Sequence, residues 1–162
     1  MFKKIIFALF VLCIALVGLY SLYGIGHFKY MNYSIENPKA DFQIIGNNEA
    51  EITVVEFLNY GCGYCKQLHP TIKELLNLRQ DIKYIARPVV FGDENMIKIT
   101  SIVLAAGLQG KFVEMHEAIL EYPEINVPDS FIEETASLYG LDYERLVKDS
   151  TGKEVNKIAE NN

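Results

Sequence analysis

Cys62 and Cys65 are the residues of this chain whose type and spacing are best suited to chemistry. They follow an apolar run, Ile52–Asn59, and open an amphipathic stretch that extends to Arg79. Two thiols separated by two residues, where a strand meets a helix, are typical of a redox pair that alternates between dithiol and disulfide. Such a pair needs no bound cofactor, because the sulfur atoms themselves carry the electrons.

The position of each cysteine predicts its role. A thiol at the N-terminus of a helix lies next to unpaired backbone N–H groups and the positive end of the helix dipole, which lower its pKa. Cys62 directly precedes the predicted helix, so we expect it to be the attacking thiolate. Cys65 lies one turn further on, where a less exposed thiol would resolve the mixed disulfide by attacking Cys62.

Glu56 is the one charged residue in its predicted strand, between two apolar residues on either side: Val54, Val55, Phe57 and Leu58. If this carboxylate is buried beneath the cysteines, it can relay a proton to or from Cys65. The alternative is that Glu56 lies at a strand edge and faces water, as most glutamates do.

A different chemistry is open to the same residues. Cys62, Cys65 and His69 together would make a three-ligand site for zinc or copper(I), as in a metal carrier. Structural zinc sites usually add a second ligand pair, which this sequence does not offer. The other interpretation of His69, which precedes Pro70, is a helix-surface or packing residue.

Length and charge exclude several classes of protein. The 162 residues, half of them apolar, suffice for one domain with a real core, and three cysteines are too few for a disulfide scaffold. After residue 29, twelve Lys and Arg stand against 21 Asp and Glu, which is a net charge of −9. This balance opposes nucleic-acid binding, which requires a basic face.

The N-terminus is predicted to engage the membrane. Two lysines precede residues 5–26, which carry no formal charge and are long enough to cross a hydrocarbon core of about 30 Å. Residues 1–28 are therefore expected to form an anchor, or alternatively a signal peptide cleaved before His27. Either places residues 30–162 in an exported compartment that permits disulfides. Cys13, inside the apolar segment, is expected to be an inert buried thiol.

The remaining chain is expected to fold as a linker, a sheet unit and a helical region. Residues 29–40 form the predicted linker, and residues 41–92 a βαβ core that starts with a short strand at Asp41–Ile45. Its other strands, Ile52–Asn59 and Ile82–Ala86, are predicted to run parallel because a helix connects them.

From residue 93 to residue 162 the apolar pattern is helical. Pro128 is predicted to lie at the start of one helix, and Asp142 to cap another. The last helix is expected to be capped by Ser150 or Thr151.

The segment from Val54 to Lys66, VVEFLNYGCGYCK, resembles the active-site segment of DsbA-family thiol-disulfide oxidoreductases, thioredoxin-fold proteins of the bacterial envelope. The similarity covers roughly residues 41–162. It includes Gly46-Asn47, Arg87-Pro88 and the stretch from Ala105 to His116. The resemblance implies an α/β thioredoxin-like fold in which residues 93–162 form a helical insertion. It also implies that Cys62 is the nucleophile, Cys65 the resolving thiol and Glu56 the buried acid.

The dipeptide between the cysteines, Gly63-Tyr64, is not the Pro-His of strongly oxidising members and resembles that of isomerases and reductase-like relatives. Because these residues tune the potential, disulfide formation, isomerisation and reduction all stay open. The implied partners are cysteine-containing exported proteins and a membrane or soluble redox partner. The implied location is the bacterial inner membrane facing the periplasm, or the periplasm itself after cleavage. An oligomer would form through residues 5–40.

The resemblance also implies two further antiparallel strands and a final helix, with a cis-proline opening the first of those strands. No such segment is recognisable before Asn162, so we expect a C-terminally truncated form, with an inactive or partner-completed remnant as the alternative function. Val127-Pro128 is predicted to start a helix rather than to supply the missing proline. The strand from Ile52 is then expected to have one unpaired edge.

Overall fold

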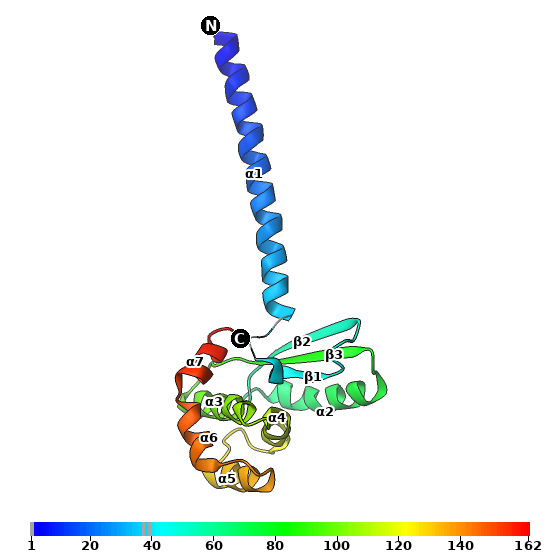
Figure 1. Ribbon diagram of the computed structural model, residues 1–162, viewed down its shortest axis with the longest axis vertical. Helices are drawn as coiled ribbons and strands as arrows, with labels where there is room; N and C mark the ends of the chain where they lie inside the picture. The colour runs from blue at the N-terminus through cyan, green and yellow to red at the C-terminus, as the bar shows by residue number, and fades with distance from the viewer. Residues whose placement is uncertain (1, 37, 39) are drawn as a thin grey trace. The chain divides into compact units, whose positions relative to one another are not determined.

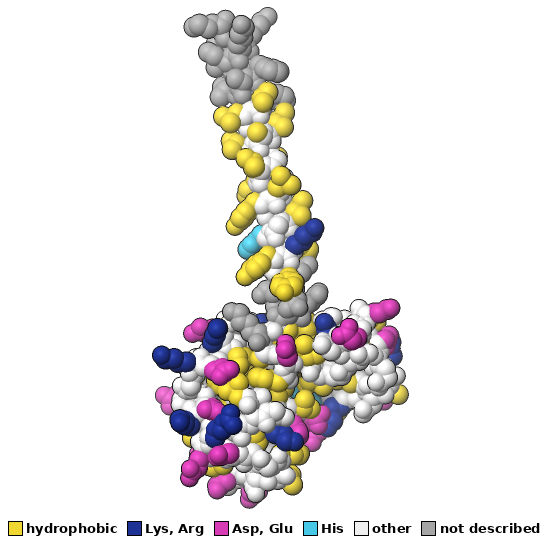
Figure 2. Space-filling view, viewed as in Figure 1, with side chains coloured by type: hydrophobic (Ala, Val, Ile, Leu, Met, Phe, Trp, Pro, Cys, Tyr) yellow, Lys and Arg dark blue, Asp and Glu magenta, His cyan; other side chains and the backbone are white. Residues whose placement is uncertain are grey.

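The structure, a computed structural model, describes residues 2–36, 38 and 40–162. It divides into two compact units, Met1–Asn37 and Pro38–Asn162. The first unit is one helix, α1 (Phe2–Glu36), of which Val11–Met31 is long and apolar enough to cross a membrane. Figure 2 shows hydrophobic side chains along its described part. The predicted N-terminal apolar helix is confirmed.

Helix α1 continues further than the sequence analysis expected. Residues 29–36, assigned there to a linker, are helical. The reason lies in the sequence, because the first proline after the apolar segment is Pro38, and only there does a residue without a backbone N–H interrupt the pattern.

The second unit is built on a three-stranded sheet with the order β1-β3-β2 (Figure 1). Strands β2 (Ile52–Leu58) and β3 (Ile82–Pro88) are parallel, as predicted, and β1 (Ile44–Gly46) pairs antiparallel with β3. The short strand expected at residues 41–45 begins later, because Asp41–Gln43 form a 3₁₀ turn, η1.

Helix α2 (Gly63–Leu78) connects β2 to β3 and lies along one face of the sheet (Figure 1). Its apolar residues Cys65, Ile72 and Leu76 pack against the hydrophobic core, together with Val54 of β2. These residues are seven and four positions apart, which places them on one face of the helix. The helix therefore holds the start of its first turn, where the cysteines lie, firmly over the end of β2.

Five helices follow β3: α3 (Glu94–Leu108), α4 (Phe112–Glu121), α5 (Asp129–Leu138), α6 (Tyr143–Ser150) and α7 (Lys153–Ala159). Helix α3 is central and contacts α4, α6 and α7. It approaches η1 so closely that a Cβ on Gly107 would lie 2.4 Å from the ring of Phe42. The helical region and the sheet therefore share one core.

The predicted helix starts are largely found. Asp142 caps α6 by accepting a hydrogen bond from the Arg145 backbone N–H, and Pro128 is the N-cap of α5. The cap of α7 is Gly152, one residue after the predicted Thr151. All described peptide bonds are trans, Val127–Pro128 included, so this pair starts a helix as expected.

Strand β2 lies at the edge of the sheet. Within residues 40–162 it pairs with β3 alone, and its other edge carries no strand. The backbone groups along that edge are thus available for pairing.

Candidate functional site

Cys62 is the N-cap of α2, at the end of a short loop that follows β2. Asn59 shapes this loop, because its side-chain oxygen accepts from the Gly61 N–H at 2.8 Å and its amide donates to the Phe91 carbonyl at 2.6 Å. The Cys62 N–H donates to the Asn59 carbonyl at 2.9 Å. A Cβ on Gly61 would lie 2.1 Å from the sulfur of Met96, so a larger residue here would require the Met96 side chain to move.

The two thiols have different electrostatic environments. The pKa of Cys62 is lowered, first by the backbone N–H of Cys65 and then by the Cys65 thiol. The pKa of Cys65 is raised, chiefly because burial disfavours its thiolate. Both are partly exposed free thiols in the structure, and Cys65 packs against the core. The two thiols therefore differ, with the lowered pKa at Cys62 and the raised pKa at Cys65.

Glu56 lies on the face of β2 that is covered by α2. It is half-buried and accepts a short hydrogen bond from the phenol of Tyr84 on β3. Its charge is one of the causes that raise the pKa of Cys65, after burial and the neighbouring Cys62. The carboxylate therefore lies close enough to Cys65 for its charge to affect that thiol.

The surface around the cysteines is apolar. Tyr64 on α2, Phe91 before α3 and Ile125 before α5 are 84%, 75% and 50% exposed. Two hydrogen bonds link their segments to the cysteine region, from Asn59 to the Phe91 carbonyl and from Lys66 to the Glu124 carbonyl. Exposed apolar groups close to a reactive thiolate suit a partner that presents hydrophobic side chains beside its own cysteine.

Lys66, next to Cys65, ties α2 to the end of α4. Its ammonium group donates to three backbone carbonyls, those of Ile119 at 3.1 Å, Tyr122 at 2.7 Å and Glu124 at 2.9 Å. Carbonyls of a last helical turn have no partner within the helix, and a cation there also complements the helix dipole. Lys66 thereby fixes the first turn of α2 against the helical region.

His69 is buried against α4. It is 5% exposed, and its ring packs edge-on against His116 of α4 with centroids 5.7 Å apart. Within the described part of the chain, no three His, Cys, Asp or Glu side chains gather as a metal site. The alternative of a site formed by Cys62, Cys65 and His69 is therefore not supported, and the packing role of His69 is found instead.

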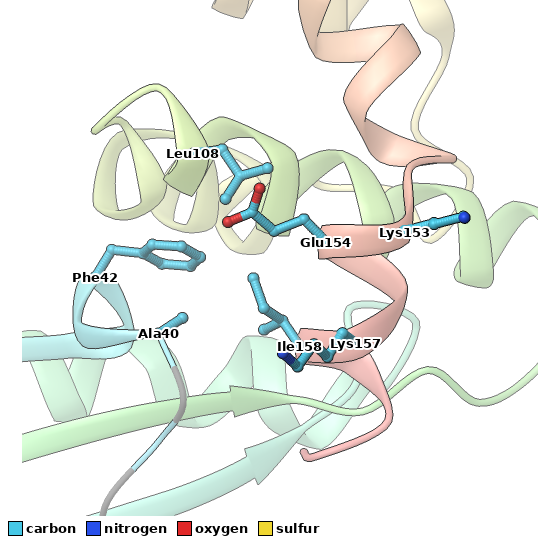
Figure 3. Close-up of a pocket in the computed structure, with 7 residues that line it drawn as sticks. All are labelled: Ala40, Phe42, Leu108, Lys153, Glu154, Lys157 and Ile158. Carbon is cyan, nitrogen blue, oxygen red and sulfur yellow. The ribbon is translucent and has the colours of Figure 1, made fainter.

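A hollow of about 670 Å³ lies elsewhere, between η1 and α7 (Figure 3). Phe42, Leu108 and Ile158 give it apolar walls, and the Glu154 carboxylate points into it, whereas the Lys153 ammonium group points away. None of its lining residues belongs to β2, α2 or the cysteine loop. The hollow is thus separate from the cysteine loop.

Three contacts at the site were not anticipated from the sequence: Tyr84 with Glu56, Lys66 with three carbonyls, and Tyr60 with His116. Tyr60 immediately precedes Gly61, and its hydroxyl lies 2.8 Å from Nδ1 of His116, a residue 56 positions away. A tyrosine inside an apolar stretch was the available signal, because a buried phenol needs a hydrogen-bond partner.

The chain is similar in sequence to known proteins. The sequence matches the thioredoxin family over residues 39–161. It is also 37% identical over 88 residues to the Na(+)/H(+) antiporter NhaA 1 of Salinispora arenicola, and 32% identical over 90 residues to NhaA 3 of Salinispora tropica. These matches cover 53% and 54% of this chain but 13% and 14% of the antiporters, so the chain spans a small part of the length of those relatives.

Solved structures have the same fold. A thioredoxin-like oxidoreductase from Silicibacter pomeroyi has a TM-score of 0.70 and 27% identity, with 80% of this chain and 73% of that chain covered. The thiol-disulfide exchange protein alpha-DsbA2 from Wolbachia pipientis has a TM-score of 0.72 and 23% identity, covering 82% and 72%. The catalytic domain of Proteus mirabilis ScsC has a TM-score of 0.68 and 21% identity, with 82% of this chain and 73% of that chain covered. At 23% and 21% identity, the last two structures show similarity of fold alone.

Proposed function

This chain belongs to the DsbA-like branch of the thioredoxin family, and from this premise we propose that it is a protein thiol-disulfide oxidoreductase of the bacterial envelope. The predicted α/β thioredoxin-like fold with a helical insertion is confirmed by the family match and the similar structures. The cysteine pair of that fold is present at Cys62 and Cys65. Its use in catalysis, the direction of electron flow and the substrates are proposals.

The observation that carries the proposal is the asymmetry of the two thiols. The thiol with the lowered pKa lies at the N-terminus of α2, and the thiol with the raised pKa packs against the core. The Cys62 thiolate attacks a substrate disulfide, forms a mixed disulfide and releases one substrate thiolate. Cys65 then attacks the Cys62 sulfur, the Cys62–Cys65 disulfide forms, and the second substrate thiolate leaves. The substrate gains two electrons and two protons, and the enzyme pair loses them.

Read in reverse, the same steps oxidise a substrate dithiol, so one site serves reduction, oxidation and, through both, isomerisation. In either direction Cys65 must lose or regain a proton where burial raises its pKa. Glu56 is proposed to accept that proton during reduction of a substrate and to return it during oxidation. Its half-buried position near Cys65 supports this role.

The proposed substrates are exported proteins that contain cysteines, and the exposed side chains of Tyr64, Phe91 and Ile125 would contact their apolar segments. Helix α1 supports a location at the inner membrane facing the periplasm, or in the periplasm if it serves as a cleaved signal. A membrane-bound or soluble redox partner would restore the starting state of the pair.

The test is a redox titration of the full chain in detergent. Cys13→Ser keeps the third thiol out of the measurement. The protein is equilibrated in glutathione buffers, quenched with a mass tag and analysed for free thiols at Cys62 and Cys65. We expect a potential displaced from that of the same chain in denaturant, because the fold stabilises one form of the pair. The sign of the displacement would separate an oxidase or isomerase from a reductase. Equal potentials would overturn the proposal.

A further inference from the structure

Tyr84 occupies an unusual position for a tyrosine. It is 2% exposed in the middle of β3, and its hydroxyl donates to the Glu56 carboxylate on the neighbouring strand. In the parallel register Val54 faces Tyr84 and Glu56 faces Ala86. Side chains two residues apart on a strand share one face, so Tyr84 and Glu56 are diagonal neighbours on the face that α2 covers. The hydroxyl thus meets the carboxylate beneath the first turn of α2.

We propose that Tyr84 is a positioning residue for the thiol chemistry, whose hydroxyl holds the Glu56 carboxylate in the place from which it exchanges a proton with Cys65. This inference rests on the proposed oxidoreductase function. A carboxylate without such a donor could turn toward the open edge of β2, where water would compete for it.

The chemistry of a buried phenol suits this role. Burial, followed by the hydrogen bond to Glu56, raises the pKa of Tyr84, so the phenol stays protonated and remains a donor at every working pH. Its ring is fixed in the core, which makes the hydroxyl a rigid support.

The titratable groups around this pair are few. Cys65 on α2 and Cys62 at its N-cap face Glu56 from above, and the charge of Glu56 contributes to raising the pKa of both thiols. Tyr60 from the preceding loop is the other titratable neighbour of Tyr84, and its own hydroxyl is engaged with His116 of α4. A change in pH dependence on removal of the Tyr84 hydroxyl would therefore arise at Glu56 or at the thiols.

The experiment follows both steps of exchange in one reaction. The reduced full chain in detergent, with Cys13→Ser, is mixed with a chromogenic aryl disulfide in a stopped-flow instrument. The first aryl thiolate is released when Cys62 attacks, and the second when Cys65 resolves the mixed disulfide. The rates of both phases are recorded against pH for the parent protein, for Tyr84→Phe, for Glu56→Gln and for the double variant.

We expect Tyr84→Phe to leave the first phase unchanged and to slow the second roughly tenfold, the rate equivalent of one hydrogen bond to a charged group. The pH dependence of the second phase should also differ from that of the parent protein, because the proton exchange between Glu56 and Cys65 is disturbed. In the Glu56→Gln background the same substitution should change nothing, since Tyr84 acts through Glu56.

Tyr60→Phe is the matched control. It removes the hydroxyl of another buried tyrosine, which bonds to His116 and not to Glu56, and it should leave the second phase at the parent rate. An equal slowing by Tyr84→Phe and Tyr60→Phe, or a slowing that persists in the Glu56→Gln background, would overturn the proposal. A parent protein without a second phase would instead refute the oxidoreductase function itself.

Discussion

At the residue scale, the two cysteines differ because one ends a loop and the other begins a buried stripe. Cys62 has a lowered pKa through the hydrogen bonds at the start of α2, and Cys65 has a raised pKa through burial. The proposed roles of attacking and resolving thiol rest on these positions, and each thiol can be removed separately.

We therefore predict that Cys65→Ser accumulates mixed disulfides between Cys62 and exported proteins, because nothing resolves them. Cys62→Ser should accumulate roughly tenfold less mixed disulfide. The remaining Cys65 thiol has the raised pKa and is therefore the poorer nucleophile. Non-reducing electrophoresis after rapid alkylation measures both. Equal trapping by the two variants would contradict the assignment.

The cysteine pair at the start of a helix was predictable from the sequence, because spacing and helix start are local properties, whereas the order of attack stays a prediction. The sequence also indicated Glu56, since a carboxylate among apolar neighbours stands out in a strand. It did not indicate Tyr84, because the pairing with Glu56 depends on the register of two strands that are 28 residues apart in the chain. The proposed action of Tyr84 through Glu56 stays a prediction.

At the element scale, the position of α2 depends on one buried cation. Lys66 donates to three carbonyls at the end of α4 and in the loop that follows. Burial lowers the pKa of Lys66, which shows that this ammonium group is partly removed from water.

We predict that Lys66→Met lowers the free energy of unfolding by about 1–3 kcal/mol, because three carbonyls lose their donor. Lys73→Met is the control on the same helix. Its ammonium group pairs with the partly exposed Glu117 and Glu121, and such pairs contribute about 1 kcal/mol or less. Denaturant unfolding of both variants measures the difference. A larger loss for Lys73→Met would contradict this account.

Most elements were predictable, and the exceptions have physical causes. The alternation and helical stripes of β2, α2, β3 and the later helices are local patterns, and the parallel pairing follows from the connecting helix. The 3₁₀ turn at η1 and the helix at residues 29–36 were missed. Short polar stretches have weak intrinsic preferences, and their surroundings decide.

At the scale of the whole molecule, a buried histidine makes stability depend on pH. His116 is 1% exposed, stacks on Phe112 and bonds to Tyr60. Burial lowers its pKa to about 3, and the nearby His69 adds to this. In the unfolded chain a histidine titrates near about 6.5, so the unfolded state takes up the proton first. The contribution of neutral His116 to the free energy of unfolding is then fully present above the pKa of the unfolded chain and is lost as the pH falls below it.

We predict that unfolding becomes easier by roughly 2 kcal/mol between about pH 6.5 and about pH 5, a window in which most carboxylates stay ionised. His116→Gln should be less stable at neutral pH and should lose most of this slope. Urea unfolding at a series of pH values measures it. An unchanged slope in the variant would show that other groups cause the dependence.

The unpaired edge of β2 affects how whole molecules contact one another. An exposed strand edge invites pairing with another chain. We predict that the full chain in detergent self-associates as its concentration rises, and that Thr53→Lys on β2 reduces this because charge opposes edge pairing. Thr71→Lys, on the exposed surface of α2, adds the same charge and should have no such effect. Light scattering after size exclusion measures the mass. Equal behaviour of both variants would exclude the β2 edge.

The glycines on either side of Cys62 have opposite tolerances to change. A side chain at residue 61 would collide with the Met96 sulfur, whereas a Cβ on Gly63 would meet nothing within 4 Å. Gly63 and Tyr64 are also both exposed. An engineer, or natural selection, can therefore exchange the two residues between the cysteines and retune the potential of the pair without repacking the interior. A change at residue 61 would require the Met96 side chain to move, so a library built on this scaffold should randomise 63 and 64 while keeping 61 fixed.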